Sequence, residues 1–545
     1  MHIRHPYCLL ATLLIVNLLL PCDGYTIADI QVKVIDIFHS QQNYLPLRGL
    51  RKLKVNTKSE DLLKILPVKI GQICSTLALQ ETERRLRELK IFKKVLVTSS
   101  VSENRVFITI EVEDNWTISP RVAFDSQNYQ IEKFGVQDKN FLGLMKNVSL
   151  SFKRDELKTE YQLSYLDNLF WGKDLTAQLL LVDRSDGERA GIKIEDQLSD
   201  LSKERGWGVE LLKSRTTIFK SVIKPNDLEF KRDLLVQEFS LAKQNRIGEG
   251  QWLQTVGGLR GRKVEFQHLE SGNAFFERNF LGPFFRASFL QPRFKTVDFF
   301  NFFDTLEDLD LGFSITAEVH YTPSLFDLSH SFNPVLGFSK GFELSEENFF
   351  MLRGSFQTRL EEKKGFNNSV LNFASTFFTY LNDPFTSNVS SFSFTKNVVL
   401  SENLDLDRQF TMGGESGLVG YKNQSIIGEN LVYFKAEYRN NFKHKILDLI
   451  AFGGSLFFEA GSSVNDFSDL KKPWLANLGF GIRFYLTNLS PPRVFRLDFG
   501  IPVRDHQDSS EFEIRLTIHE ESAFQKSLFE ERQDFDQFLN IGLID

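Results

Sequence analysis

The sequence predicts a membrane protein of the all-β class, a 16-stranded antiparallel transmembrane β-barrel that follows one small α/β domain. Segments in which apolar and polar residues alternate recur between residues 115 and 518, as in barrel strands that face lipid on one side. Phe supplies 54 of the 545 residues and Met only 4, an imbalance that favours a large apolar surface outside a soluble core. Charged residues make up 25% of the chain and the mean hydropathy is -0.22, which excludes a helical membrane protein and a disordered chain.

Residues 1–24 have the pattern of a secretory signal peptide. Basic residues precede an apolar run from Cys8 to Leu20, and cleavage is expected after Gly24. Pro21 stands where a lipoprotein signal needs a small residue, so lipidation is not expected. No later run reaches 18 apolar residues, so the sequence predicts no membrane-spanning helix.

Cleavage after Gly24 would leave one of the three cysteines in the mature chain. Cys8 and Cys22 would leave with the signal peptide, and Cys74 would remain. A single cysteine can form neither an internal disulfide nor a cysteine-based metal site. The mature chain is therefore expected to contain no disulfide.

Residues 25–114 are expected to form the small α/β domain, with the order β-α-α-β-β. Alternating apolar residues predict one strand before and two strands after a pair of helices. A capping box from Thr57 to Glu60 predicts the start of the first helix, and apolar residues recur at helical spacing from Thr76. This order fits one compact domain.

Residues 115–518 contain the predicted barrel. Near the C-terminus, Leu478 and Phe480 lie on the opposite face from Asn477. One such strand also fits a soluble β-sandwich or propeller, but the length and number of the strands behind a signal peptide favour a membrane barrel. Five candidate strands follow a Gly-rich segment at 413–421 and eleven precede it. The sum of sixteen is even, so both ends of the barrel chain are expected on the same side of the membrane.

Two short motifs lie in the barrel sequence. The first joins two glycines to a later Gly-Tyr pair and a lysine, at Gly413, Gly414, Gly420, Tyr421 and Lys422. The second is a Phe-x-Glu-x-Gly motif with charged residues on neighbouring strands, at Phe457, Glu459, Gly461, Glu437, Arg439 and Arg483. In the order of these motifs the chain resembles the BamA/TamA superfamily of outer-membrane assembly and secretion proteins. The resemblance implies that the first motif lies on the long sixth loop and the second on the barrel wall.

The small domain resembles a single POTRA domain of the same superfamily. The usual ending of such a domain, a Leu-rich helix followed by a Phe and a Val, is matched by the core positions Leu86, Leu89, Phe92 and Val95. The resemblance implies a domain that lies in the periplasm.

The chain departs from the superfamily at two positions. Val419 stands in place of a loop Arg, and Glu459 stands in place of a strand Asp. In relatives these two groups pair inside the barrel, whereas a Val side chain cannot donate to a carboxylate. We therefore predict that Lys422 contacts Glu459, although an ammonium group lacks the planar fork of a guanidinium.

Residues 519–545 are expected to form an acidic tail, with two basic and seven acidic side chains. Its apolar residues recur at roughly helical spacing, and an amphipathic segment of this kind is expected to dock. We predict that the tail faces basic residues of the POTRA domain such as Arg84, Arg85 and Lys94.

No motif indicates catalysis, a metal or a cofactor. Gly414-Glu415-Ser416-Gly417 is followed by Leu418, where a nucleophile elbow needs a glycine. The nine His residues are scattered without metal-ligand spacing. The net charge of -6 provides no basic field for nucleic acid. The chain is expected to be no enzyme, to hold no cofactor and to bind no nucleic acid.

The resemblance implies an assembly or translocation factor of the bacterial outer membrane. Unfolded outer-membrane or secreted client proteins would be received by strand addition to the POTRA sheet and then inserted by the barrel or passed through it. Outer-membrane lipid and periplasmic accessory proteins would be the other partners. Two alternatives stay open: a dedicated two-partner-type secretion pore, and a non-translocating structural barrel or scaffold.

Overall fold

The computed structural model describes twenty segments of the chain. They are residues 22–36, 55–125, 130–154, 159–196, 198, 201–220, 228–268, 274–301, 306–323, 330–362, 365–381, 388–405, 408–414, 417–422, 425–446, 450–466, 468–469, 474–486, 494–503 and 513–519. Most of the expected signal peptide and the acidic tail beyond residue 519 therefore lie outside the described residues. Among the helices of these segments, none has the length and apolar character needed to cross a membrane.

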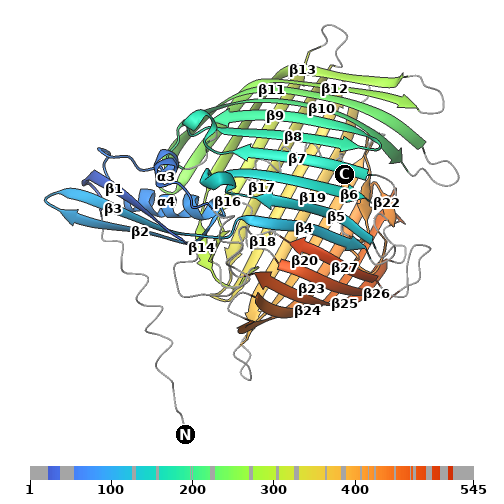
Figure 1. Ribbon diagram of the computed structural model, residues 1–545. Helices are drawn as coiled ribbons and strands as arrows, with labels where there is room; N and C mark the ends of the chain where they lie inside the picture. The colour runs from blue at the N-terminus through green and yellow to red at the C-terminus, as the bar shows by residue number, and fades with distance from the viewer. Residues whose placement is uncertain are drawn as a thin grey trace.

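The N-terminal domain has the predicted order of strands and helices (Figure 1). Its elements are β1 (Thr26–Ile35), α3 (Ser59–Ile65), α4 (Thr76–Glu88), β2 (Phe92–Ser102) and β3 (Arg105–Asp114). The sheet order is β1-β3-β2, with β1 parallel and β2 antiparallel to β3. Alternate residues of β3, beginning with Val106 and Ile108, form one core with Leu79 and Leu86 of α4. The period-two pattern in the sequence thus buries one face of the sheet under the helices.

The two helices of this domain begin differently. Ser75 caps α4, because its hydroxyl accepts a hydrogen bond from the backbone N–H of Ala78 at 3.3 Å. The predicted capping box at the start of α3 is wrong, since no side chain caps that helix. The hydroxyl and the backbone N–H of Thr57 donate to Asp114 instead, at 2.7 and 2.9 Å. Thr57 thereby ties the start of α3 to the end of β3.

A disulfide joins Cys22 to Cys74, with 5.6 Å between their Cα atoms. The expectation of a chain without a disulfide is therefore wrong. A mature chain that keeps this bond must be cleaved before Cys22 and not after Gly24. Asp23 strengthens the link, because its carboxylate accepts hydrogen bonds from the backbone N–H and the hydroxyl of Thr76 at 2.9 and 2.7 Å. These bonds hold the pKa of Asp23 below its usual range.

Twenty of the described strands close into one antiparallel barrel (Figure 1). They are β4 (Ile118–Asp125), β5 (Gln130–Asp138), β6 (Lys146–Arg154), β7 (Thr159–Asp167), β8 (Thr176–Arg184), β9 (Gly187–Asp196), β10 (Arg205–Lys220), β11 (Leu228–Gly248), β12 (Gln251–His268), β13 (Ala274–Gln291), β16 (Phe313–Thr322), β17 (Ser331–Glu343), β18 (Asn348–Glu361), β19 (Gly365–Leu381), β20 (Val389–Glu402), β23 (Asn430–Ile446), β24 (Ile450–Val464), β25 (Leu475–Leu486), β26 (Val494–Pro502) and β27 (Glu513–His519). Two hairpins lie outside this sheet, β14 (Phe294–Val297) with β15 (Glu307–Asp310) and β21 (Phe410–Met412) with β22 (Ile426–Gly428).

The predicted number of sixteen barrel strands is wrong. Five strands follow the Gly-rich segment, as predicted, but fifteen precede it, and the additional strands are β4, β5, β9 and β13. β13 contains Gly282-Pro283, a pair that usually ends a strand. Pro283 lies just outside the ladder between β13 and β16, which begins at Phe284, so its missing N–H costs no bond there. Because twenty is also even, the first strand still begins at the end of the barrel where the last strand finishes.

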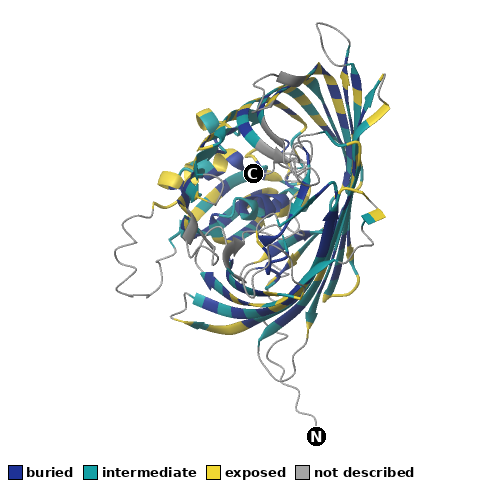
Figure 2. Ribbon diagram, turned by 90° about the vertical axis from the view of Figure 1, so that its right-hand side faces the viewer, coloured by how far each residue is buried: buried dark blue, intermediate teal, exposed yellow. Residues whose placement is uncertain are grey.

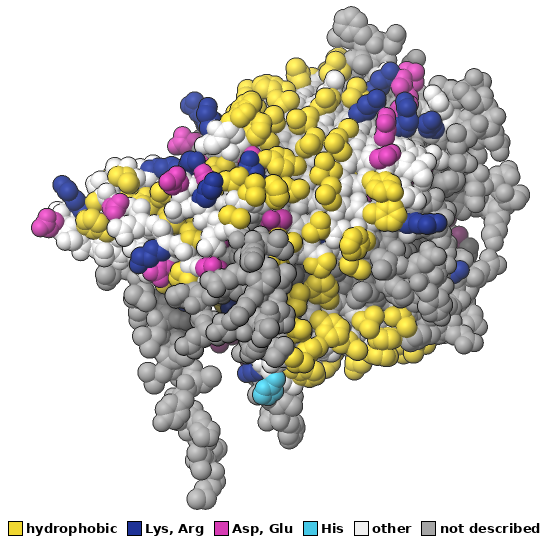
Figure 3. All heavy atoms as spheres, viewed as in Figure 1, with side chains coloured by type: hydrophobic (Ala, Val, Ile, Leu, Met, Phe, Trp, Pro, Cys, Tyr) yellow, Lys and Arg dark blue, Asp and Glu magenta, His cyan; other side chains and the backbone are white. Residues whose placement is uncertain are grey.

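The strands turn apolar side chains outward and polar side chains inward, as the alternating pattern predicts. On β25, Leu478 and Phe480 are 54% and 43% exposed, whereas Asn477 is fully buried. Figure 3 shows apolar side chains over the outer wall, with charged side chains gathered toward its ends. Figure 2 looks along the barrel from the end opposite the N-terminal domain, and exposed and buried residues alternate along the strands. This outer wall is the surface that a barrel presents to lipid.

The first and last strands share the shortest ladder among the described barrel strands. β27 and β4 have two register pairs, Arg515 with Asp125 and Leu516 with Phe124. By contrast, β26 and β27 have seven register pairs and β4 and β5 have eight. Opening the barrel wall between β27 and β4 therefore breaks fewer ladder hydrogen bonds than opening it between other described strands.

Candidate functional site

The chain between β20 and β23 folds back into the barrel. Its hairpin of β21 and β22 lies against β24, where the Ser463 hydroxyl donates to the Phe410 carbonyl at 3.1 Å. Met412, Leu418 and Tyr421 are fully buried and pack against side chains of β19, β20 and β23. We call residues 403–429 the lumenal loop, which is the segment that the resemblance identifies as the sixth loop.

The tip of the lumenal loop is a tight turn that depends on glycines. Gly413 and Gly414 have φ angles of 127° and 63°, in the region that glycine adopts at little cost. The backbone N–H groups of Gly414 and Tyr421 donate to the Leu418 carbonyl at 3.3 and 2.9 Å and close the turn. The two glycines of the first sequence motif therefore shape the loop.

Glu459 of β24 holds the tip against the wall, and its side chain is 1% exposed. One carboxylate oxygen accepts from the backbone N–H of Val419 at 2.8 Å and from the Asn477 amide at 3.1 Å. The other accepts from the Tyr433 hydroxyl at 2.7 Å. Lys435 supplies the positive charge, with its Nζ 3.5 Å from the carboxylate. A backbone N–H of the loop thus takes the place of the Arg side chain that the resemblance led us to expect.

The predicted contact between Lys422 and Glu459 is wrong. Lys422 is exposed, and the cation beside the buried carboxylate is Lys435, which lies directly opposite Glu459 in the register of β23 and β24. Residues that lie directly opposite each other on neighbouring strands are close enough to interact. Lys422 is near the loop tip in sequence, whereas strand pairing brings Lys435 of the wall beside Glu459.

Gly420 allows the tip to lie flat on the wall. A Cβ atom at this position would lie 2.9 Å from the Asn477 Cβ and 3.1 Å from the Pro502 nitrogen, and a Cβ atom on Gly500 would lie 2.6 Å from the Gly420 nitrogen. The neighbouring Tyr421 donates its hydroxyl to the Ala476 carbonyl at 2.9 Å. Two glycines that face each other therefore bring the loop and wall backbones into contact.

The Phe-x-Glu-x-Gly motif forms the floor on which the loop rests. A Cβ atom on Gly461 would lie 2.5 Å from the Met412 sulfur, so the absence of a side chain admits the loop. Phe457 is buried and covers Gly479, and the Lys435 ammonium lies 5.3 Å from the centre of its ring. The motif thus combines an acceptor, a small residue and an aromatic ring in one docking surface.

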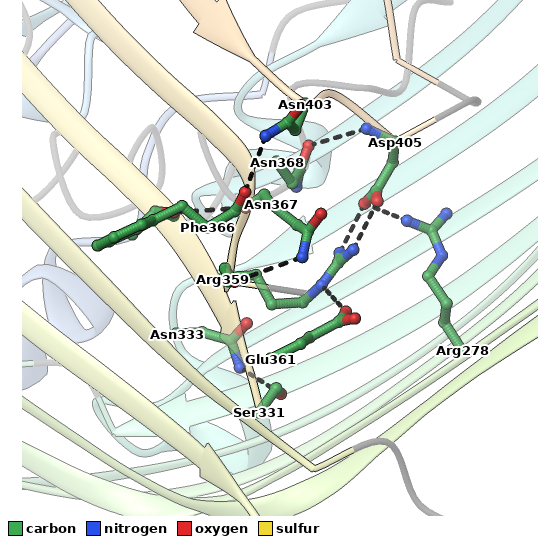
Figure 4. Close-up of polar contacts among 12 residues, drawn as sticks. Arg278, Ser331, Asn333, Arg359, Glu361, Phe366, Asn367, Asn368, Asn403 and Asp405 are labelled. Atoms are coloured by element: carbon green, nitrogen blue, oxygen red, sulfur yellow. Dashed lines mark hydrogen bonds and ion pairs between the residues drawn. The ribbon is translucent and has the colours of Figure 1, made fainter. Parts of the chain in front are cut away.

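A second anchor lies at the start of the lumenal loop (Figure 4). Asp405 accepts two hydrogen bonds of 2.7 Å from Arg359 of β18 and pairs with Arg278 of β13. Close by, Arg408 donates to Asn368 at 2.9 Å. Burial would raise the pKa of the Asp405 carboxyl, but the hydrogen bonds from Arg359 and the charge of Arg278 outweigh it and hold this pKa below its usual range. No sequence motif points to this anchor, because its residues come from three distant segments.

The other predicted wall residues belong to two separate contacts. Glu437 is buried and pairs with Arg439 at 2.7 Å and with Arg496 at 2.9 Å. Arg483 donates instead to the carbonyl of Asn301, at 3.4 Å. Within the described segments, no group of three or more His, Cys, Asp or Glu side chains is placed to hold a metal ion.

Helix α4 docks the N-terminal domain on one end of the barrel, which we call the near end. Arg85 pairs with Asp174 at 2.7 Å, in the connection between β7 and β8. Arg87 pairs with Asp308 of β15 at 2.8 Å. Burial would lower the pKa of Arg87, but the charge and hydrogen bonds of Asp308 outweigh burial and raise it. The domain is therefore held by at least two charged contacts.

The predicted core positions of the small domain lie together. Leu86 and Val95 are buried, and Leu89 and Phe92 pack against the same cluster. Arg84, by contrast, is buried and pairs with Glu81 at 2.6 Å.

Arg84 and Arg85 each pair with another carboxylate, Glu81 and Asp174, and the predicted contact of the acidic tail with these residues stays a prediction. Lys94 is exposed. The tail itself lies outside the described residues.

A closed barrel with an apolar outer wall and a loop anchored in its lumen defines a class, the outer-membrane β-barrel proteins. Residues 140–521 match the Omp85 superfamily domain, and the chain belongs to this superfamily. The prediction of a BamA/TamA-type protein is thereby confirmed. Members of the superfamily insert or translocate proteins at the bacterial outer membrane.

Several solved structures are similar to this chain. BamA from Haemophilus ducreyi lacking POTRA domains 1-3 is 11% identical, with 91% of this chain and 85% of that chain covered and a TM-score of 0.41. CdiB from Acinetobacter baumannii is 10% identical, with 91% and 73% covered and a TM-score of 0.43. CdiB from Escherichia coli is 12% identical, with 90% and 76% covered and a TM-score of 0.45. No curated protein matches the sequence.

Proposed function

We propose that this protein assembles or translocates client proteins at the outer membrane by strand addition. The observation that carries the proposal is the seam of two register pairs between β27 and β4. An opened seam exposes the backbone N–H and C=O groups of β4, which can pair with an extended client whatever its sequence. The anchored lumenal loop supports the proposal, because it is bonded to β24 through Val419 and to β25 through Tyr421, strands that lie three and two places from β27.

The N-terminal domain, residues 25–114, is proposed to act as a single POTRA domain that receives clients along β2. The outer edge of β1 is partly covered, because residues 71–74 bond to its first residues, with Ile27 N–H donating to the Gln72 carbonyl at 2.9 Å. β2 is the other edge, and among the described strands it pairs with β3 alone. An extended client can therefore add to β2 through main-chain hydrogen bonds.

The barrel comprises residues 115–518, and its near end is proposed to face the periplasm. The N-terminal domain docks there, and an even number of strands returns the chain to the same end after β27. This orientation also puts residues 519–545 in the periplasm. Periplasmic accessory proteins and the surrounding lipid are the partners that this arrangement implies.

Two alternatives are weighed against this proposal. The scaffold alternative rested on the missing loop Arg, but Glu459 and Arg359 anchor the loop without it, so the missing Arg no longer supports a scaffold. A dedicated secretion pore stays the second candidate, since a pore and an insertion factor share the same barrel.

Depletion of the protein, followed by quantitative proteomics of the outer-membrane and secreted fractions, tests the proposal. Loss of many barrel proteins would support assembly, and loss of one exported protein would support a dedicated pore. Unchanged fractions would contradict both and leave the scaffold. Re-expression of the wild-type chain is the control, because it must restore whatever depletion removes.

A further inference from the structure

The connection between β13 and β16, residues 292–312, is unusually long for the near end of the barrel. It has 21 residues, whereas the connection from β11 to β12 has two and that from β17 to β18 has four. It contains the hairpin of β14 and β15, and its residues 294–301 and 306–311 are among those that the structure describes. We call these described residues the insert.

The tip of the insert packs into the wall beside it. Phe300 is 2% exposed, and its ring centre lies 4.1 Å from that of Phe378 and 6.4 Å from that of Phe349, on β19 and β18. The Tyr380 hydroxyl donates to the Asp298 carbonyl at 2.6 Å. Met351 of β18 is 3% exposed and belongs to the same apolar cluster.

The insert also reaches a distant part of the barrel wall. Arg483 of β25 donates to the Asn301 carbonyl at 3.4 Å, and Phe299 packs against residues of β24, β25 and β26. These strands lie six to eight positions from β16 in a barrel of twenty, so the insert crosses the lumen. Glu307 stiffens the crossing, because it accepts 2.7 Å bonds from both the backbone N–H and the amide of Asn301.

Helix α4 contacts the β14–β15 hairpin of the insert. Arg87 donates to both carboxylate oxygens of Asp308, at 2.8 and 3.1 Å. The guanidinium of Arg84 lies 4.9 Å from the centre of the Phe294 ring. Asp308 is also held from within the hairpin, by the Thr296 hydroxyl at 2.7 Å.

We propose that the insert is a plug that closes the near end of the lumen, and that Arg87 of α4 latches it in place. Its contacts on two sides of the barrel close the lumen at the proposed periplasmic mouth. Its contact with α4 couples the plug to the position of the N-terminal domain. A client that shifts this domain would release the plug. That last step rests on the proposed function, whereas the closure and the latch do not.

Maleimide labelling of a cysteine under the insert tests the latch in the full-length protein. Met351→Cys is the reporter, because Met351 is shielded by the insert, and Cys22 and Cys74 are already joined in a disulfide. Adding Arg87→Gln is expected to speed labelling about tenfold, the effect of losing one charged hydrogen-bonded contact on a two-state equilibrium. Arg85→Gln is the matched control, since Arg85 lies on the same helix and pairs with Asp174, outside the insert. Its labelling rate is expected to stay at the reporter's own value.

A second variant separates a moving plug from a fixed one. Phe300→Ala removes the main anchor of the tip and is also expected to speed labelling, while heat-modifiable migration on gels confirms that the barrel stays folded. Unchanged labelling in both Arg87→Gln and Phe300→Ala would overturn the proposal and make the insert a fixed part of the wall. Equal acceleration by Arg85→Gln would overturn the latch, because domain docking in general would then control access. These measurements use purified protein without clients, so they can fail while the proposed function holds, and the reverse.

Discussion

Replacing Glu459 with Gln removes one charge from the centre of the loop anchor while keeping the size of the side chain. The carboxylate accepts hydrogen bonds from Val419, Tyr433 and Asn477 and faces the Lys435 ammonium at 3.5 Å. Gln offers one acceptor oxygen in place of two. At least one of the three donors therefore loses its acceptor, and the lysine loses its counter-ion.

The size of the effect follows from these contacts. A hydrogen bond to a charged group contributes about 1.5–3 kcal/mol, and a buried group that loses its partner costs about 1–3 kcal/mol. Since neighbouring contacts do not add, Glu459→Gln is expected to lower the free energy of unfolding by about 2–4 kcal/mol in total. The lumenal loop is expected to detach first, because the barrel ladders do not depend on this carboxylate.

Urea unfolding in detergent, followed by heat-modifiable migration and by protease cleavage within residues 403–429, measures both effects. Lys422→Gln is the matched control, because Lys422 is exposed, and it is expected to change stability by less than about 0.5 kcal/mol. Equal effects of Glu459→Gln and Lys422→Gln would refute the reasoning, as would a loop that stays protected from protease in Glu459→Gln.

Three further predictions concern the loop and the N-terminus. Gly420→Ala would place its Cβ 2.9 Å from the Asn477 Cβ and is expected to destabilise the protein by about 1–3 kcal/mol in the same urea assay. Gly454→Ala is the control, because no atom lies nearer than 4.0 Å to its Cβ, and it is expected to be nearly neutral. The pKa of Asp405 is lowered in the folded state, so the stability that its carboxylate contributes is fully present above the unfolded pKa of about 3.9 and is lost as pH falls through the lower folded pKa. Protease protection of the lumenal loop should fall over this acidic range. Asp405→Asn should remove this pH dependence. The mature protein is expected to contain Cys22 in a disulfide, so intact mass and thiol titration should find no reactive thiol, and reduction of a bond that spans 52 residues should cost roughly 4 kcal/mol. A mature chain that starts at residue 25 with a reactive Cys74 would contradict this.

The class of fold follows from local pattern, whereas the strand number does not. The outward residues of β25 alternate in the sequence as they do in the structure, because the period of a strand is a local property. β13 has no such clear pattern, since Gly282-Pro283 interrupts it, and only the end of the ladder at Phe284 explains how it fits. Strand number thus depends on pairings that the sequence does not display.

The candidate site shows the same division. Glu459 and Gly420 could be found from their motif, because the loop and the wall each keep a recognisable local pattern. The residues that contact them could not be found from the sequence. Lys435 reaches Glu459 through strand register, and Arg359 reaches Asp405 across 46 residues of sequence. Contacts made by register and by distant segments leave no spacing in the sequence to detect.

A disulfide across the seam tests the central claim most directly. Phe124→Cys with Leu516→Cys joins β4 to β27 at a register pair, and Leu497→Cys with Leu516→Cys joins β26 to β27 and leaves the seam unlinked. Each variant is expressed in depleted cells, and the level of outer-membrane proteins is measured with and without a reductant. Our account predicts that the seam-linked protein restores these proteins only after reduction, while the control restores them in either state. Full restoration by the oxidised, seam-linked protein would contradict the account, because the barrel would then act without opening between β27 and β4.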